Sequence, residues 1–185
     1  MAGPAYLYFD ALNMRYPKTK DFNMKRAIYP GSFDPITNGH VDIIKRALLV
    51  FDSILIAISH NQEKSPAFSI DERTELIEQS FADEKRIEVT NFSGLLVDFA
   101  NKMKTPLIVR GLRAASDFEY EFQLAAMNRS IRSDIDTFFF MTGSDTYFLS
   151  SRLVKEVAFL GGDVKKMVPP HVAQALTRKR CQMER

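Results

Sequence analysis

Two stretches of the sequence concentrate residue types that bind phosphate groups. The first, YPGSFDPITNGH (29–40), combines turn-forming glycines and prolines with a hydroxyl side chain and the imidazole of His40. The second, RGLRAASDFEYE (110–121), opens with Arg110 and Arg113, whose planar guanidinium groups suit phosphate oxygens. Together they favour the binding of phosphate groups.

The first stretch has the composition of a phosphate-binding turn. Gly31 lets the backbone turn tightly and approach a ligand, and Ser32 adds a hydroxyl. The motif Thr37-x-Gly-His40 then opens a predicted helix, whose free N–H groups and dipole favour a phosphate. The same dipole disfavours an imidazolium, so we expect His40 to be neutral and to donate one N–H. The alternative is a plain strand-to-helix loop in which His40 only caps the helix.

Further anion-binding residue types follow other predicted strands. Lys64 lies in the loop HNQEKSPAF, and SSR (150–152) stands at the start of a predicted helix. The two arginines have a competing interpretation, because ion pairs with Asp117, Glu119 or Glu121 would occupy them without any ligand. Both interpretations remain open at the level of the sequence.

Other kinds of site are excluded by what the sequence lacks. It has no Gly-x-x-x-x-Gly-Lys-[Ser/Thr] loop and no Gly-x-Gly-x-x-Gly, so neither a P-loop nor an ordinary dinucleotide fold is indicated. His60 and His171 have no partners at metal-ligand spacing, and the single cysteine, Cys181, cannot form an internal disulfide. A net charge of +2 gives no reason to expect nucleic acid, and no apolar run is long enough for a membrane span.

The elements that must position these residues alternate regularly along the chain. Runs of apolar and β-branched residues predict strands over 25–29, 53–59, 86–92, 106–111 and 136–142. Helical spacing and capping signals predict helices over 40–51, from Ser69 to about Phe81, over 94–104, from Ser116-x-x-Glu119 to about Ile131, from Ser150 or Ser151 to Gly161-Gly162, and from Pro169-Pro170 onward.

This alternation predicts an α/β fold: a doubly wound, Rossmann-like sheet of five parallel strands in the order 3-2-1-4-5, with extra C-terminal helices. We expect a single domain over 24–185. Residues 1–23 show no sustained periodicity and are expected to be an extension, either an expression leader or the result of a start codon placed too early. In the predicted order the first and fourth strands lie side by side where the order reverses, and ligands bind at the carboxyl edge there. Because the two phosphate-binding stretches follow those strands, we expect them to form one site.

The two stretches together resemble the bacterial phosphopantetheine adenylyltransferases, members of the nucleotidyltransferase superfamily with the [His/Thr]-x-Gly-His motif. The resemblance runs from about Lys25 to near Leu176 and covers RAIYPGSFDPITNGH, RGLRAASDFEYEFQLAAMNR and LVKEVA. It implies a cytoplasmic enzyme of coenzyme A biosynthesis that transfers the adenylyl group of ATP to 4′-phosphopantetheine. The implied products are dephospho-CoA and pyrophosphate, formed by direct in-line attack without a covalent intermediate.

The resemblance also implies roles for individual residues. His40 would stabilise the transition state, with Lys64 and Arg113 as further catalytic residues. The residues implied to bind 4′-phosphopantetheine are Ser32, Lys64, Leu96 and Arg110. The residues implied to bind ATP are Ser32, Phe33, His40, Gly111, Leu112, Arg113, Glu121, Thr146, Tyr147, Phe148, Leu149, Ser150, Ser151 and Arg152. The last segment departs from the family pattern, because TYFLSSR stands where WSFISSS or a close relative is common.

The implied reaction agrees with the residue types. A phosphate monoester has its second pKa near ~6, so the nucleophile is largely dianionic at pH 7 and no general base is required. The reaction needs charge neutralisation, in-line positioning and a metal for the leaving pyrophosphate. Mg²⁺ would be held largely by ATP oxygens and water, with no protein side chain as ligand. The resemblance further implies a homohexamer and feedback inhibition by coenzyme A, with no nucleic-acid or membrane partner.

Two competing functions are considered. One is a sister enzyme, such as a nicotinamide-mononucleotide adenylyltransferase or a cytidylyltransferase. Their motif usually begins with His where this chain has Thr37, and they are not expected to carry RGLRAASDFEYE. The other is a nucleotide-binding regulatory module without catalysis, against which the joint presence of His40, Lys64, Arg110 and Arg113 argues.

Overall fold

The strands of the protein form one parallel sheet in the predicted order. The computed structural model describes residues 25–60, 66–113, 115–143 and 145–183. The strands are β1 (Arg26–Gly31), β2 (Ser53–Ser59), β3 (Ile87–Phe92), β4 (Leu107–Leu112) and β5 (Asp136–Met141). Within the described residues they form a five-stranded sheet in the order β3-β2-β1-β4-β5, and every neighbouring pair is parallel. The predicted extension over 1–23 lies outside the described residues.

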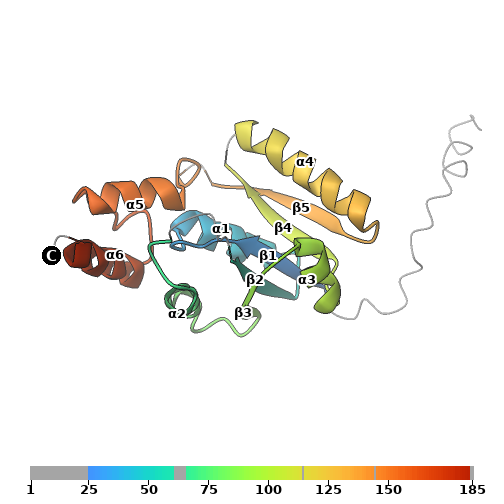
Figure 1. Cartoon of the computed structure of the whole chain (residues 1–185), viewed down its shortest axis with the longest axis horizontal. Coiled ribbons are helices and arrows are strands. Elements are labelled where there is room, and N and C mark those ends of the chain that lie inside the picture. Colours follow the sequence, from blue (N-terminus) through green and yellow to red (C-terminus); the bar gives the residue numbers. More distant parts are fainter. Residues whose placement is uncertain (1–24, 61–65, 114, 144, 184–185) are drawn as a thin grey trace, which may run out of the picture.

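Helices cover both faces of this sheet, as a doubly wound fold requires (Figure 1). The helices are α1 (Asn38–Ala47), α2 (Ile70–Ser80), α3 (Leu96–Lys102), α4 (Ala115–Ile131), α5 (Ser151–Phe159) and α6 (Pro170–Met183). One core packs apolar residues of α1, α2, α5 and α6 against one face of the sheet. A smaller core packs residues of α3 against the other face, on which α4 also contacts α3, β4 and β5.

The alternation of side chains along β1 and β2 explains the two cores. Ala27 and Tyr29 belong to the larger core, whereas Ile28 between them belongs to the smaller one. Successive residues of a strand point to opposite faces, so a continuous apolar run supplies both faces at once. All five central residues of β2 are buried, which is why the run SILIAIS contains no polar residue between its terminal serines.

Most predicted helix boundaries agree with the structure. Ser69 caps α2 and forms the expected capping box with Glu72, and Pro170 is the first residue of α6. The helix predicted over 40–51 is shifted in the structure. It begins at Asn38, because Thr37 is its N-cap, and it ends at Ala47.

The prediction that Ser116 caps the fourth helix is wrong. The helix α4 already begins at Ala115, so Ser116 lies inside its first turn. A Ser-x-x-Glu spacing is compatible with the interior of a helix as well as with its start.

The topology brings both phosphate-binding stretches to one place. Strands β1 and β4 are direct neighbours, with Ile28 opposite Ile108. Their carboxyl ends therefore open onto the same edge of the sheet, where the strand order reverses. The first turn of α1 follows β1, and α4 follows β4 at this edge.

Candidate active site

A cavity of about 430 Å³ lies where β1, β4 and the starts of α1 and α5 meet. Its wall joins segments that are far apart in the sequence, from Tyr29 to Arg152. The predicted site residues that line it are Ser32, Phe33, His40, Arg110, Gly111, Arg113, Glu121, Leu149, Ser150, Ser151 and Arg152. Residues of both stretches therefore line one cavity, and their role as a functional site stays a prediction.

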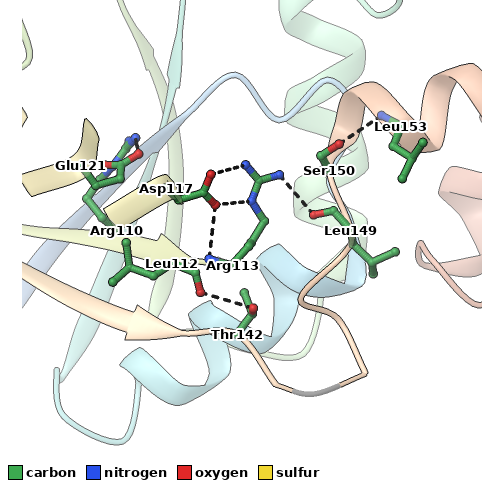
Figure 2. Close-up of polar contacts among 9 residues, drawn as sticks. All are labelled: Arg110, Leu112, Arg113, Asp117, Glu121, Thr142, Leu149, Ser150 and Leu153. Carbon is green, nitrogen blue, oxygen red and sulfur yellow. Dashed lines mark hydrogen bonds and ion pairs between the residues drawn. The ribbon is translucent and has the colours of Figure 1, made fainter. Parts of the chain in front are cut away.

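Other predicted site residues lie outside this cavity. Leu96 lines a second cavity of about 180 Å³, which shares Arg110 and Glu121 with the first. Leu112 is buried in the sheet, and its carbonyl accepts the backbone N–H and the hydroxyl of Thr142 (Figure 2). The remaining predicted residues that do not line the main cavity are Thr146, Tyr147 and Phe148. Lys64 lies outside the described residues.

His40 is held at the third position of α1 by the turn that precedes it. The Nδ1 atom of its ring accepts the backbone N–H of Thr37 at 3.0 Å. The backbone N–H of His40 in turn donates weakly to the Thr37 hydroxyl at 3.4 Å. A backbone N–H can only donate, so Nδ1 is the acceptor and the proton of the neutral ring sits on Nε2. The capping interpretation of His40 is thus correct, yet it also leaves Nε2–H as a donor.

The environment keeps the imidazole neutral. Burial, together with the positive charges of the nearby Arg113 and Arg110, lowers the pKa of His40 from its ordinary value of 6.5 to about 4. This lowered pKa agrees with the expectation that the imidazole is neutral at pH 7. The causes are desolvation and like charge, in addition to any effect of the helix dipole.

Phe33 packs directly against this imidazole. The two rings meet edge to face with centroids 5.1 Å apart, and the Phe33 ring also contacts Tyr29 at 5.4 Å. Phe33 has a φ of +45°, a left-handed backbone conformation that residues other than glycine rarely adopt. The ring occupies the space beside Gly31, where an added Cβ would stand 3.0 Å from it. Gly31 is therefore needed because the aromatic ring folds back over the turn.

Arg110 forms a two-pronged ion pair with a carboxylate of the cavity wall. Its Nε and Nη2 bond the two carboxylate oxygens of Glu121 at 2.6 Å each, and Nη1 donates to the carbonyl of Pro30 at 3.0 Å. Figure 2 shows the two side chains facing each other from β4 and α4. The ion-pair alternative considered from the sequence is present, and it fixes the guanidinium at the edge of the cavity.

Arg113 is paired in a similar way but is more exposed. Its Nε donates to Asp117 at 3.0 Å, and its Nη1 lies 3.5 Å from the carbonyl of Leu149 (Figure 2). The contact with Leu149 links the β4 side of the cavity to the segment before α5. Both arginines are thus preorganised, and neither is a free cation.

The start of α5 forms the opposite wall, and its serine hydroxyls are used within the protein. Ser150 is the N-cap and accepts the N–H of Leu153 at 3.1 Å (Figure 2), while Ser151 donates to the carbonyl of Pro35 at 2.8 Å. The first N–H groups of a helix have no partner within the helix and remain available to an anion. Arg152 lines the cavity, and its side chain has no ion pair or hydrogen bond with any described residue.

Some residues of the wall were not identified from the sequence. Tyr29, Ile43 and Thr142 also line the cavity, whereas the sequence predicts only that they belong to two strands and a helix. Burial raises the pKa of the Tyr29 phenol above its ordinary value, so this hydroxyl stays protonated. Periodicity could have indicated Tyr29, because it lies on the same face of β1 as Ala27 and directly before the turn.

The described side chains do not form a cage for a metal ion. No group of three or more His, Cys, Asp or Glu residues with suitable geometry occurs among them. Asp117 and Glu121, the carboxylates beside the cavity, are already bound to arginines. In the part of the chain that is described, no helix has the length and apolar character needed to cross a bilayer.

Comparison with known proteins identifies relatives that share most of the chain. The cytidylyltransferase-like family model matches residues 28–157. The chain is 52% identical over 155 residues to the phosphopantetheine adenylyltransferase of Anaeromyxobacter dehalogenans strain 2CP-C, covering 84% of this chain and 94% of that protein. It is 54% identical over 156 residues to the enzyme of the same name from Geotalea daltonii, covering 84% of this chain and 97% of that protein.

Solved structures show the same fold at much lower sequence identity. A candidate nicotinate-nucleotide adenylyltransferase from Vibrio parahaemolyticus superposes with a TM-score of 0.63 at 17% identity, covering 83% of this chain and 99% of that one. At this identity the likeness concerns the fold alone. It agrees with the parallel sheet and helical layers described above.

Proposed function

The chain belongs to the phosphopantetheine adenylyltransferase family within the cytidylyltransferase-like proteins, and from this premise we propose that it transfers the adenylyl group of ATP to 4′-phosphopantetheine. The products would be dephospho-CoA and pyrophosphate, within coenzyme A biosynthesis. The observation that carries the proposal is the joining of His40, Arg110 and Arg113 in one cavity with the start of α5. This set of donors suits two phosphate groups that must approach each other.

The proposed chemistry is a direct displacement at the α-phosphorus of ATP. An oxygen of the acceptor monoester attacks, and the bond to the leaving pyrophosphate breaks in line with it. The monoester is largely dianionic above pH ~6, so it needs no base to activate it. The protein contributes positioning and charge stabilisation, which are the main terms in phosphoryl-type transfers.

His40 is proposed to stabilise the transition state through its Nε2–H. Because the Thr37 N–H occupies Nδ1, the ring cannot rotate or change tautomer without losing a hydrogen bond. A neutral donor in a fixed position can stabilise the negative charge that develops on an α-phosphate oxygen during the reaction. Preorganised donors of this kind act mainly on the transition state. Arg113 is proposed to neutralise the ATP phosphates beside it.

The acceptor is proposed to lie toward the second cavity. Arg110 stands between the two cavities, and Leu96 lines the second one together with apolar and amide side chains of α4. This arrangement supports a phosphate near Arg110 with a longer, partly apolar chain extending past Leu96. Lys64 is proposed as a further cation for the acceptor phosphate.

The remaining partners are proposed from the family and the chemistry. Mg²⁺ would enter with ATP, held by triphosphate oxygens and water, since the described side chains offer no cage. We also propose that the enzyme acts in the cytoplasm, assembles as a homohexamer and is inhibited by coenzyme A, which shares the pantetheine chain. Residues 1–23 are proposed to be an extension outside the single catalytic domain.

Stereochemistry tests the proposed displacement. A single diastereomer of ATP in which sulfur replaces one non-bridging oxygen of the α-phosphate has a stereogenic α-phosphorus. It should give a thio-dephospho-CoA with inverted configuration at that phosphorus when the purified protein uses 4′-phosphopantetheine. Mass spectrometry identifies the product, and phosphorus NMR gives its configuration. Retention of configuration would indicate two successive displacements and would contradict a reaction without a covalent intermediate.

A further inference from the structure

A buried arginine stands behind the turn that follows β1. Arg73 of α2 is only 5% exposed, and it does not line the cavity. Its Nη1 donates to the carbonyl of Ser32 at 2.8 Å, and its Nε donates to the carbonyl of Ser69 at 3.2 Å. A charged side chain is almost never buried unless it is paired, so this position calls for an explanation.

The carboxylate that balances Arg73 is equally buried. Asp34 is 6% exposed and accepts the N–H groups of Ala67 at 3.1 Å and Phe68 at 3.0 Å. It also pairs with Lys155 of α5. Burial lowers the pKa of Arg73, whereas the charge of Asp34 acts in the opposite direction and favours the protonated guanidinium. Arg73 and Lys155 are thus two cations beside the one anion Asp34, next to the turn that lines the cavity.

The hydrogen bond from Arg73 determines which way one peptide group faces. The Ser32–Phe33 bond is trans, so its C=O and N–H point in opposite directions. Because the carbonyl of Ser32 points to Arg73, the N–H of Phe33 points away from it. Both residues line the cavity, and no described residue accepts the Phe33 N–H.

This orientation is not the one that the backbone would adopt by itself. Phe33 has a φ of +45°, which is unfavourable for a residue with a side chain. Turning the peptide plane by half a rotation would bring that φ to about −135°, within the broad β region. The relaxed orientation would aim the Ser32 carbonyl, instead of the Phe33 N–H, toward the cavity and would repel a phosphate.

We propose that Arg73 is a positioning residue that holds the Ser32–Phe33 peptide with its N–H directed at a phosphate oxygen of the substrate. The cation on the carbonyl also polarises the peptide, which makes the N–H on its other side a stronger donor. The following residue, Asp34, is held by the ion pair with Lys155 and by the N–H of Ala67, so the turn is fixed on both sides. This inference rests on the proposed function, because it assumes that the cavity binds a nucleotide phosphate chain.

Three ligands and three variants separate this role from a purely structural one. Calorimetry with inorganic pyrophosphate, ATP and adenosine should show that Arg73→Met raises the Kd of the two phosphate ligands by about tenfold or more, while that of adenosine stays within about twofold. Arg73→Lys keeps the charge and should recover most of the affinity. The matched control is Lys179→Met, which removes another cation bound to α2, at Glu72; neither Lys179 nor Glu72 lines the cavity.

Two results in these variants would overturn the inference. One is Arg73→Met protein that binds pyrophosphate as tightly as the wild type. The other is an equal loss of affinity for adenosine and for pyrophosphate, which a general structural defect would produce. If the wild type bound neither ATP nor pyrophosphate, the proposed function itself would fail, and this inference with it.

A measurement on the unmodified chain keeps the test decisive if Arg73→Met does not fold. In ¹⁵N-labelled wild-type protein, adding pyrophosphate should move the Phe33 amide proton downfield, as expected for a new charge-assisted hydrogen bond. An unchanged Phe33 amide at saturating pyrophosphate would overturn the inference.

Discussion

The Nδ1 atom of His40 accepts the backbone N–H of Thr37 at 3.0 Å, and this contact links helix capping to the chemistry of the cavity. One ring nitrogen completes the capping box of α1. The other must then carry the proton of the neutral imidazole. The two interpretations of His40 considered from the sequence, cap and donor, therefore describe two atoms of the same side chain.

Replacing His40 separates these two roles. We expect His40→Ala to lower kcat by about 10²–10³-fold, because one preorganised donor to the transition state is lost. The affinity for ATP should change by less than about tenfold, since the donor acts mainly after the ground state. Steady-state kinetics and calorimetry measure the two effects.

The matched control is Glu72→Ala, which removes the corresponding third-position residue of the α2 capping box outside the cavity. Each variant should lose about 0.5–2 kcal/mol of stability from its cap, and Glu72→Ala also loses the pair with Lys179. Only His40→Ala should lose kcat. Near-normal kcat with badly weakened ATP binding in His40→Ala would reduce His40 to a ground-state contact.

The depressed pKa of His40 predicts a dependence of stability on pH. The pKa is about 4 in the folded protein, below the ordinary value of 6.5, so the unfolded chain binds the proton more readily. Stability from this group is therefore complete above about pH 6.5 and is lost as the pH falls toward 4, by on the order of 3 kcal/mol. NMR titration of the imidazole measures the pKa directly. A midpoint near 6.5 in the folded protein would contradict this environment.

The ion pair between Arg110 and Glu121 predicts a non-additive pair of substitutions. Arg110→Ala should weaken 4′-phosphopantetheine by about 10- to 150-fold and ATP much less, since the arginine is assigned to the acceptor phosphate. It also leaves the partly buried carboxylate of Glu121 without its partner. Adding Glu121→Ala should therefore restore part of the lost affinity. Equal losses for both ligands in Arg110→Ala, measured by calorimetry, would show that the assignment is wrong.

Arg152 should contribute to the binding of charge without contributing to the fold. It has no partner among the described residues, so Arg152→Ala should leave the melting temperature nearly unchanged. ATP affinity should fall several-fold in dilute buffer, and the difference from the wild type should shrink as salt screens the charge. Affinity that is unaffected at low ionic strength would show that Arg152 points away from the phosphates.

Local patterns were sufficient to predict the sheet and the meeting of the two stretches. The run SILIAIS (53–59) is too apolar for any position but a covered strand, and β2 spans the same seven residues. With alternating helices, the right-handed crossover between parallel strands restricts the possible strand orders to a few. The turn residues after β1 and the arginines after β4 then predict where the site lies.

Long-range partners could not be predicted in this way. Arg73 precedes Leu76 and Ile77 by three and four residues, so its place on the buried face of α2 was visible in the sequence. Its partner is the carbonyl of Ser32, 41 residues earlier, and the pairing depends on how the turn folds back. The left-handed backbone of Phe33 was hidden for the same reason, since nothing in the local sequence requires it.

The choice of acceptor tests the central claim most directly. Pyrophosphate release from ATP should be measured in the wild-type protein with 4′-phosphopantetheine, nicotinamide mononucleotide and glycerol phosphate as alternative acceptors under the same conditions. The account predicts turnover with 4′-phosphopantetheine, because the cavity around His40 adjoins the second one lined by Leu96 through Arg110. Turnover with nicotinamide mononucleotide or glycerol phosphate, and none with 4′-phosphopantetheine, would contradict it.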